Sequence, residues 1–295
     1  MSGAEALAEH LGGGCSTVAR CWEVQRKDGT RFGFTDHDLD LEFDGLVFRA
    51  ETGMSAAALQ QGTGLAVDNS EAVGALSDGA VTEADIAAGR FDGARVTAWL
   101  VNWSDVTARK VLFRGSLGEI TRSGGAFSAE LRGLTEWLNR PVGRVFQAPC
   151  SAVLGGTGCG VDLSRAGMWG EGVISEVRDT GAIVLELEAE FEPDWFQRGR
   201  LNVLDGEAHG LWGAIKRDTS LNATARLIEL WEPLRARLGV GDRAKLIVGC
   251  DKRFETCRAK FDNLVNFQGF PDIPQEEWVM IHPTMARSLG GGSLR

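Results

Sequence analysis

The chain has 295 residues, 43% hydrophobic and 24% charged, so it can bury a substantial core and has the composition of a globular protein. Its 31 basic and 41 acidic residues give a net charge of −10, which argues against a protein whose main task is to grip nucleic acid phosphates. No run of 18 apolar residues is present and residues 1–14 do not resemble a signal peptide. We therefore expect no membrane-spanning segment and synthesis in the cytoplasm.

Short apolar runs separated by tight-turn signals recur along the chain. The turn signals are Asp28-Gly29, Asp44-Gly45, Gly124-Gly125 and Asp179-Thr180-Gly181. The longest strand candidates are residues 94–103, 110–120, 182–190, 225–231 and 244–249. Helices are expected to be few and short, at residues 4–11, 82–90 and 134–140, and the second begins with a weak capping box at Thr82. The pattern predicts a mainly β protein, a β-rich α+β fold with antiparallel pairing.

The order of these patterns suggests a division of the chain. Residues 141–170 contain seven glycines and two prolines without a sustained period, which is typical of a loop. We predict an N-terminal β-rich domain (1–140), a Cys-rich region (141–171 plus 250–283), a second β-rich domain (172–249) and a flexible tail (284–295).

The cysteines provide the strongest chemical signal. The pairs Cys150/Cys159 and Cys250/Cys257 follow Cys-x8-Cys and Cys-x6-Cys spacings. Four thiolates suit an iron–sulfur cluster or zinc, although zinc ligands usually pair more closely. On spacing alone, cluster, zinc and four metal-free thiols all remain open. Cys15 and Cys21 are interpreted as core thiols.

Helix geometry constrains the second pair. Seven residues of continuous helix would separate Cys250 and Cys257 by roughly 10 Å along the axis. We therefore expect Cys250 in a loop and Asp251 as the cap of a short helix with Phe254, Cys257 and Phe261 on one face. Nearby cations would offset thiolate charge, namely Lys252, Arg253, Arg258 and Lys260.

An acidic run, TDHDLDLEFDG, places carboxylates at alternate positions, Asp36, Asp38, Asp40, Glu42 and Asp44, with His37 among them. On a strand they would share one face, which could bind a cation, line a channel or simply be solvated. A solvated strand face or a channel lining is the preferred interpretation.

Signatures of catalysis are otherwise missing. The chain contains no nucleophile elbow, P-loop, zincin or Rossmann motif, and its histidines (10, 37, 209 and 282) stand far apart. We predict no enzymatic activity. The chain has nine tryptophans. Two of them would suit a subunit contact if exposed, Trp103 in NWSD and Trp195 in EPDWFQRG.

Three segments together resemble a known family. They are TDHDLDLEFDGLVFRAETGMSAAAL, NSEAVGALSDGAVTEADIAAGRFDGARVTAWLVNW and GCDKRFETCRAKFDNLVNFQGFPDIP. The chain is similar over nearly its whole length to tail-tip (baseplate) hub proteins of tailed phages and gene transfer agents, and more distantly to the iron–sulfur tail-tip protein of phage lambda. The resemblance implies β-barrel domains related to tail-tube proteins and a [4Fe-4S] cluster held by Cys150, Cys159, Cys250 and Cys257.

The resemblance also implies an assembly: a homotrimer in the tail tip of the particle, forming a ring around the DNA channel. A distal tail or tube ring would lie on one side and a fibre-bearing or tip protein on the other, with tape-measure or peptidase components as further partners. DNA would pass without specific binding, which agrees with the acidic composition. Three alternatives remain: a zinc-stabilised tail protein, a cell-envelope thiol hydrolase using Cys150, and a redox iron–sulfur protein.

Overall fold

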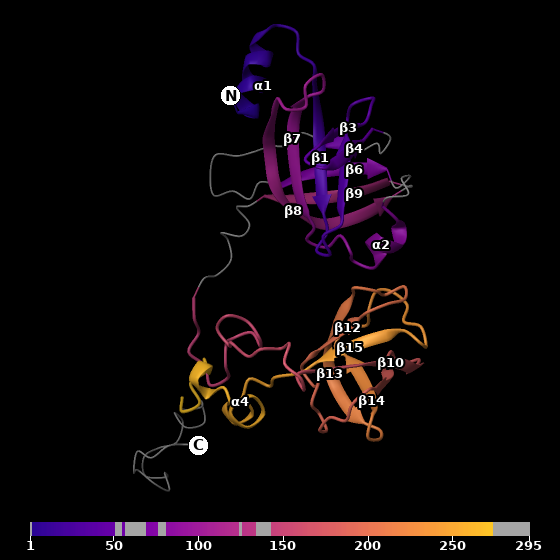
Figure 1. Ribbon diagram of the computed structural model, residues 1–295, viewed down its shortest axis with the longest axis vertical. Coiled ribbons are helices and arrows are strands. Elements are labelled where there is room, and N and C mark those ends of the chain that lie inside the picture. The colour runs from indigo at the N-terminus through magenta and orange to yellow at the C-terminus, as the bar shows by residue number, and fades with distance from the viewer. Residues whose placement is uncertain are drawn as a thin grey trace. The chain divides into compact units, whose positions relative to one another are not determined.

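The computed structural model describes residues 2–50, 55–56, 69–75, 81–123, 126–133 and 143–273. The chain divides into two compact units, Met1–Pro141 and Val142–Arg295 (Figure 1). The predicted helix at 134–140, the Gly124-Gly125 turn, residues 274–283 and the predicted tail lie outside the described residues. The structure is mainly β, as predicted, and none of its described helices is long and apolar enough to cross a membrane.

The described strands of the first unit form one nine-stranded sheet in the order β3-β4-β2-β1-β7-β8-β9-β6-β5. Their bounds are β1 Val18–Gln25, β2 Arg31–Thr35, β3 Leu41–Phe43, β4 Leu46–Arg49, β5 Ser55–Ala56, β6 Asn69–Ala75, β7 Arg95–Asn102, β8 Arg109–Ser123 and β9 Ala126–Gly133. Every pair is antiparallel except β2 with β4, which run parallel. No described strand joins β3 to the two-residue β5, so among the described residues a closed barrel is present in the second unit alone.

The predicted turns form where their residues permit a left-handed backbone. Gly29 has a φ of 90° at the end of the β1–β2 hairpin, where the Arg26 amide donates to the Thr30 carbonyl at 2.9 Å. Asp44 and Gly45 have φ angles of 51° and 67° between β3 and β4. Two positive angles are the requirement of the two-residue turn that matches strand twist. These hairpins confirm the local prediction.

Both helices that the structure describes in the first unit begin at a capping residue. In α1 (Gly3–Gly12), Ser2 and Glu5 complete a capping box, and Gly13 follows the last turn. In α2 (Glu83–Ala87), the Thr82 hydroxyl accepts from the Asp85 amide at 3.1 Å. The second helix is shorter than predicted because the chain leaves it at Ala88 for a turn at Gly89, which has a φ of 73°.

Strand β1 is buried on both of its faces. Trp22 and Val24 belong to one core cluster, while Ala19 and Cys21 belong to another on the alternate positions. The prediction of two core thiols is therefore correct for Cys21 and wrong for Cys15. Cys15 is exposed because it lies in the turn between α1 and β1, after Gly14 with its φ of 78°.

The acidic run does not form one strand face. Thr35 ends β2 and residues 41–43 form β3, but residues 36–39 between them bend. Instead three of the carboxylates make local contacts. Asp36 accepts a hydrogen bond from the Arg20 amide at 2.6 Å, and Asp40 accepts one from the Ala50 amide at 2.9 Å. Asp44 forms an ion pair with Arg109 at 2.7 Å. The alternation that suggested a cation-binding face was misleading, because backbone amides compete for these carboxylates.

The second unit contains a closed six-stranded barrel in the order β10-β11-β14-β13-β12-β15 (Figure 1). The bounds are β10 Trp169–Val177, β11 Ile183–Leu187, β12 Arg200–Val203, β13 Trp212–Ser220, β14 Ala225–Leu230 and β15 Arg243–Ile247. Its interior is a cluster of twelve buried apolar residues. Closure leaves no edge strand, so the barrel satisfies its own backbone.

A fully buried ion pair lies within the barrel. Arg226 Nη1 lies 3.1 Å from the Asp218 carboxylate, and neither side chain has any exposure. Asp218 also accepts from the Phe196 amide at 2.9 Å, and Arg226 Nη2 donates to the carbonyls of Phe191 and Glu192. The pair therefore anchors the loop between β11 and β12 to the barrel core.

Candidate metal centre

Two segments outside the barrel wall face each other, residues 143–168 and 248–273 (Figure 1). The Cys150 amide donates to the Lys252 carbonyl at 2.8 Å, and the Phe270 amide donates to the Gln147 carbonyl at 2.9 Å. Gln268 Nε2 donates to the Gly158 carbonyl at 2.9 Å. These bonds join stretches that are about a hundred residues apart in sequence.

The first segment turns tightly between its two cysteines. The amides of Cys159 and Gly160 both donate to the Gly156 carbonyl, at 2.9 and 2.8 Å. Gly155 and Gly160 have φ angles of 73° and 70°, which disfavour any residue with a Cβ. Of the glycines predicted to curl the backbone, Gly155 and Gly160 adopt the left-handed conformation, and the turn brings Cys159 back toward Cys150.

The second segment carries Cys250 before a helix and Cys257 within it. Helix α4 spans Phe254–Phe261 and is followed by a short 3-10 turn, Leu264–Asn266. Cys250 precedes the helix, as expected, and Cys257 and Phe261 are buried on its inner face.

The predicted role of Asp251 as the helix cap is wrong. The N-cap residue is Arg253, and it makes no capping hydrogen bond with its side chain. Asp251 lies two positions earlier because Lys252 turns the chain with a φ of 68°. From there its carboxylate accepts from the Arg253 amide at 3.0 Å and the Thr256 hydroxyl at 2.9 Å.

The four cysteines line one pocket. The remaining lining residues are mostly apolar or amide side chains, with two cations: Ala152, Leu154, Val161, Lys252, Arg253, Phe261, Asn263, Asn266 and Phe267. All six cysteines of the chain are free of disulfides. No three His, Cys, Asp or Glu side chains in the described ranges approach closely enough to hold a single metal ion.

Each sulfur at the pocket has a hydrogen-bonding partner. The Gln268 amide donates to Cys150 Sγ at 3.4 Å, and the Lys252 amide donates to Cys250 Sγ at 3.4 Å. Asn263 Nδ2 donates to Cys159 Sγ at 3.7 Å, while the Cys257 thiol donates to the Asn263 carbonyl at 3.4 Å. Three of the four sulfurs thus accept an N–H, the arrangement that favours thiolates.

Burial and the nearness of the other thiols act against ionisation of Cys250 and Cys257, in opposition to these hydrogen bonds. Burial, with the neighbouring thiols Cys250, Cys150 and Cys159, raises the pKa of Cys257 from 9.0 to about 11. Burial also raises the pKa of Cys250, against the lowering effect of the Lys252 amide and ammonium. Mutual repulsion among thiolates is what a bound cationic centre relieves, so the donor set fits such a group.

Of the four cations expected beside the thiols, two line the pocket, Lys252 and Arg253. Lys252 Nζ also donates to the Ala152 carbonyl, joining the two segments. Lys260 instead faces the barrel loop: its Nζ donates to the Trp195 carbonyl at 2.6 Å and lies 4.4 Å from that indole. Burial lowers its pKa. Arg258 is exposed on the outer side of α4.

Asn263 is the residue that sequence reasoning missed. Its Nδ2 donates to the Cys159 carbonyl at 2.6 Å as well as to the sulfur, and its Oδ1 accepts from Asn266 Nδ2 at 2.8 Å. It follows Asp262, which ends α4 with a φ of 46°. Asparagine commonly follows the end of a helix, so no local signal connects Asn263 to Cys159, which is 104 residues away.

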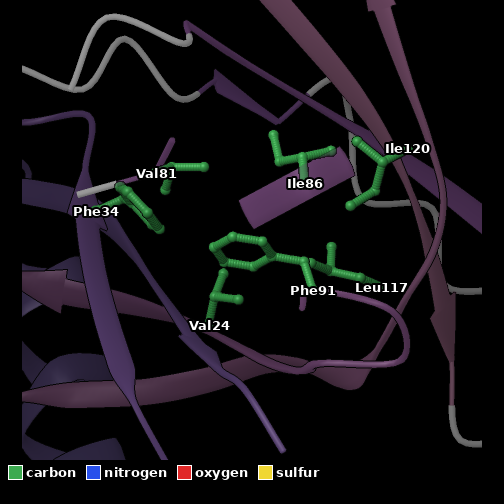
Figure 2. A pocket seen from close by; sticks show the side chains of 7 residues that line it. All are labelled: Val24, Phe34, Val81, Ile86, Phe91, Leu117 and Ile120. Carbon is green, nitrogen blue, oxygen red and sulfur yellow. The ribbon is translucent and has the colours of Figure 1, made fainter. Parts of the chain in front are cut away.

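A second pocket, in the first unit, is lined only by hydrocarbon side chains (Figure 2): Val24, Phe34, Val81, Ile86, Phe91, Leu117 and Ile120. Figure 2 shows the Phe91 ring extending between Val24 and Ile86. With no polar group to orient a ligand, this pocket suggests no chemistry.

Two family models match the chain. One, described as the baseplate hub protein, N-terminal attachment domain, matches residues 4–162, and the other, phage conserved hypothetical protein BR0599, matches residues 194–277. The first range contains Cys150 and Cys159, and the second contains Cys250 and Cys257. The candidate ligands therefore come in equal number from the two matched regions.

Among solved structures, a chain described as "Virion of native gene transfer agent (GTA) particle" is similar throughout. It is 51% identical, the match covers 99% of this chain and 100% of that chain, and the TM-score is 0.88. Comparison with curated proteins finds no match. The resemblance to phage and gene transfer agent tail proteins inferred from sequence is confirmed.

Proposed function

The chain belongs to the phage baseplate hub family, and we propose that it is a structural hub of a phage-like tail tip whose two facing segments are held by a [4Fe-4S] cluster. The observation that carries the cluster is the gathering of four thiols, from two distant segments, around one pocket. The relative from the gene transfer agent particle supports a place in a virion tail.

Cys150, Cys159, Cys250 and Cys257 would hold the cluster, with N–H groups of Gln268, Lys252 and Asn263 directed at three of the sulfurs. When bound, the cluster supplies a covalent cross-link between the segments and a positive iron centre that keeps the thiols ionised. Phe261 and Phe267 exclude water on one side, and Lys252 and Arg253 balance the thiolate charge. The residues present thus fit a structural role for the group.

In the assembled tail, we expect copies of the chain to form a homotrimeric ring around the DNA channel. A distal tail or tube ring protein would contact one side and a fibre-bearing or tip protein the other, and tape-measure or peptidase components are further candidates. The net charge of −10 supports passage of DNA without capture, because carboxylates repel phosphates. An outer wall carrying most carboxylates, with a basic lumen, would contradict this part of the proposal.

Purification without oxygen tests the cluster directly. The protein should contain about four iron and four sulfide per chain, as the cluster's composition requires, and should show the visible absorption of thiolate-bound iron. A reversible reduction at accessible potential would favour the redox alternative over a structural role. Absence of iron and sulfide would overturn the cluster assignment.

Zinc is the second candidate because four thiolates also bind it, but the described thiols would have to move closer together to share a single ion. Zinc at about one per chain, with no iron under anaerobic conditions, would establish the zinc-stabilised tail protein instead. The thiol hydrolase alternative requires a histidine beside Cys150, and the residues that line the described pocket include none.

The hub role is tested in particles rather than in the isolated chain. Deletion of the coding sequence should give particles with incomplete tails, and the wild-type chain should be detected in purified particles by mass spectrometry. Complete, infective or DNA-transferring particles without the chain would refute the hub role.

A further inference from the structure

Two tryptophans are exposed on the outer wall of the barrel, one on β13 and one just after the neighbouring strand β14. Trp212, at the start of β13, is 59% exposed, and Trp231, just after β14, is 64% exposed. The Trp231 amide donates to the Ala214 carbonyl at 3.0 Å, so Trp231 lies opposite Ala214. Ala214 is two residues after Trp212 in β13 and therefore shares its face of the strand. Together the two indoles expose about 300 Å² of largely apolar surface.

Each indole has a cation over its ring. The Arg200 guanidinium lies 5.6 Å from the Trp212 ring centre, and Lys216 Nζ lies 5.9 Å from that of Trp231. Both distances are within the range of cation–π attraction. Arg200, Trp212, Lys216 and Trp231 form what we term the tryptophan stripe, which runs across β12, β13 and the end of β14. Tryptophan and arginine are the residues most enriched at the energetic centres of protein interfaces.

The closed barrel limits how another molecule can use this surface. Because every strand of the barrel already pairs with two neighbours, a partner cannot add a strand and must contact side chains. Stripe-to-stripe contact between two copies would bring like charges together, which is unfavourable. A second copy must therefore present a different surface.

That surface exists on the same barrel. Residues 186–194, termed the acidic segment, begin in β11 and continue into the loop toward β12, and their exposed acidic residues are Glu186, Glu188, Glu190, Glu192 and Asp194. In the closed strand order, β11 is three strands from β12 in both directions, so Glu186 and Arg200 lie on opposite sides of the barrel. Contact between opposite sides of neighbouring copies is head-to-tail, and such contacts form a ring when the rotation from copy to copy closes.

We propose that the tryptophan stripe of one copy docks on the acidic segment of a second copy, so that barrel-to-barrel contacts link the copies of the hub ring. The inference rests on the proposed function and names the surfaces that the ring uses. Single-stranded nucleic acid is a poorer fit, although it also binds aromatic and basic surfaces. The stripe offers two cations, and DNA-binding proteins typically make about 6–10 phosphate contacts.

A photo-cross-linking amino acid in place of Trp212 tests this in assembled particles. We expect a cross-linked product of twice the chain's mass, with the partner peptide containing residues 186–194. The same substitution at Trp103, which is 41% exposed in the first unit, is the control. Cross-links only to another tail protein or to DNA, or none, would overturn the inference.

A charge exchange gives an independent readout. Arg200→Glu with Lys216→Glu should reduce incorporation of the chain into particles at least tenfold, and Glu188→Lys with Glu190→Lys in the same chain should restore part of it. Arg178→Glu, on the same barrel outside the stripe, should have little effect. Thermal unfolding of the purified variants controls for folding, because the exchanged residues are exposed.

Full incorporation of the Arg200→Glu, Lys216→Glu variant, or no rescue by the acidic-segment exchange, would contradict the proposed contact. Absence of the wild-type chain from purified particles would overturn the hub role, and this inference with it. Presence of the chain without a contact at Trp212 would overturn the inference alone.

Discussion

The barrel and the thiol region of the second unit are built on different principles. The six barrel strands close on themselves around twelve buried apolar residues. In the described parts of residues 143–168 and 248–273 there are no strands, and the apolar cluster contains three buried residues, Met168, Val248 and Phe261. The barrel is stabilised by burial of its own side chains, whereas the thiol region places sulfur where a core would be.

The two regions differ in the source of their stability. A dry barrel core needs nothing from outside the chain, so it should fold with or without metal. Four thiols in one pocket repel one another once ionised, so under the proposed function the facing segments would gain most of their stability from the bound cluster. Variants that act on one region and spare the other therefore test the contrast.

Replacing Cys257 by Ser should have the largest effect. Loss of one of four thiolate ligands should reduce iron content at least tenfold, since even supporting residues cost about 10–100-fold. Residues 143–168 should then become sensitive to limited proteolysis while the barrel resists. Cys15→Ser, which removes an exposed thiol of the first unit, is the matched control. Unchanged iron and protection in the Cys257 variant would break the comparison.

Replacing Asp218 by Ala should affect the barrel instead. The variant leaves the Arg226 charge buried without its partner, which should lower the free energy of unfolding by about 3–5 kcal/mol. Urea unfolding of the barrel measures this. Glu229→Ala, which removes an exposed pair with Arg217, should cost less than about 1 kcal/mol. Equal losses in the two variants would show that burial does not decide the size of the effect.

Replacing Asn263 by Ala should weaken the thiol region without destroying it. The variant loses the N–H donor to Cys159 and its carbonyl, and iron should dissociate about tenfold faster under a chelator. Asn266→Ala loses only a bond to Asn263 and should have a smaller effect. If the two variants lose iron at the same rate, the specific role assigned to Asn263 is wrong.

Cys21 shows how a thiol behaves in a dry core. Burial raises its pKa from 9.0 to about 11. Above pH 9 the unfolded chain releases this proton while the folded chain keeps it, so the free energy of unfolding should fall by about 1.4 kcal/mol per pH unit up to pH 11.

Urea unfolding of the first unit between pH 8.5 and 10.5 measures the slope, and a Cys21→Ala variant should show a shallower one. At neutral pH an alkylating reagent should modify Cys15 and leave Cys21 intact until the chain unfolds. Identical slopes for wild type and variant would mean that Cys21 does not ionise in this range.

Local features of the fold were predictable because short-range chemistry decides them. Asp28-Gly29 and Asp44-Gly45 permit the positive φ of their turns, and Thr82 caps α2 with its own hydroxyl. The prediction failed where neighbours in space intervene. Asp36 and Asp40 are drawn to backbone amides of Arg20 and Ala50, which the alternating pattern cannot reveal.

The sequence did not indicate which tryptophans are exposed. Trp195 would suit a subunit contact only if exposed, but Lys260 covers it and its indole donates to the Gly167 carbonyl at 2.9 Å. Among the tryptophans that the structure describes, the most exposed are Trp212 and Trp231, and they lie in strand contexts that look like core positions. Which face of a strand points outward depends on how the barrel closes, and that is a property of all six strands together.

By itself, the sequence determined a hairpin-rich mainly β chain, the paired spacing of four cysteines and the break between Cys250 and α4, because turn propensity and helix rise act over a few residues. The folded chain was needed to see that the two cysteine pairs share a pocket, that Asn263 joins α4 to Cys159, and that closure of the barrel turns Trp212 and Trp231 outward. These features depend on contacts between residues far apart in the chain, which are set by packing and hydrogen bonding in the folded state and leave no local pattern.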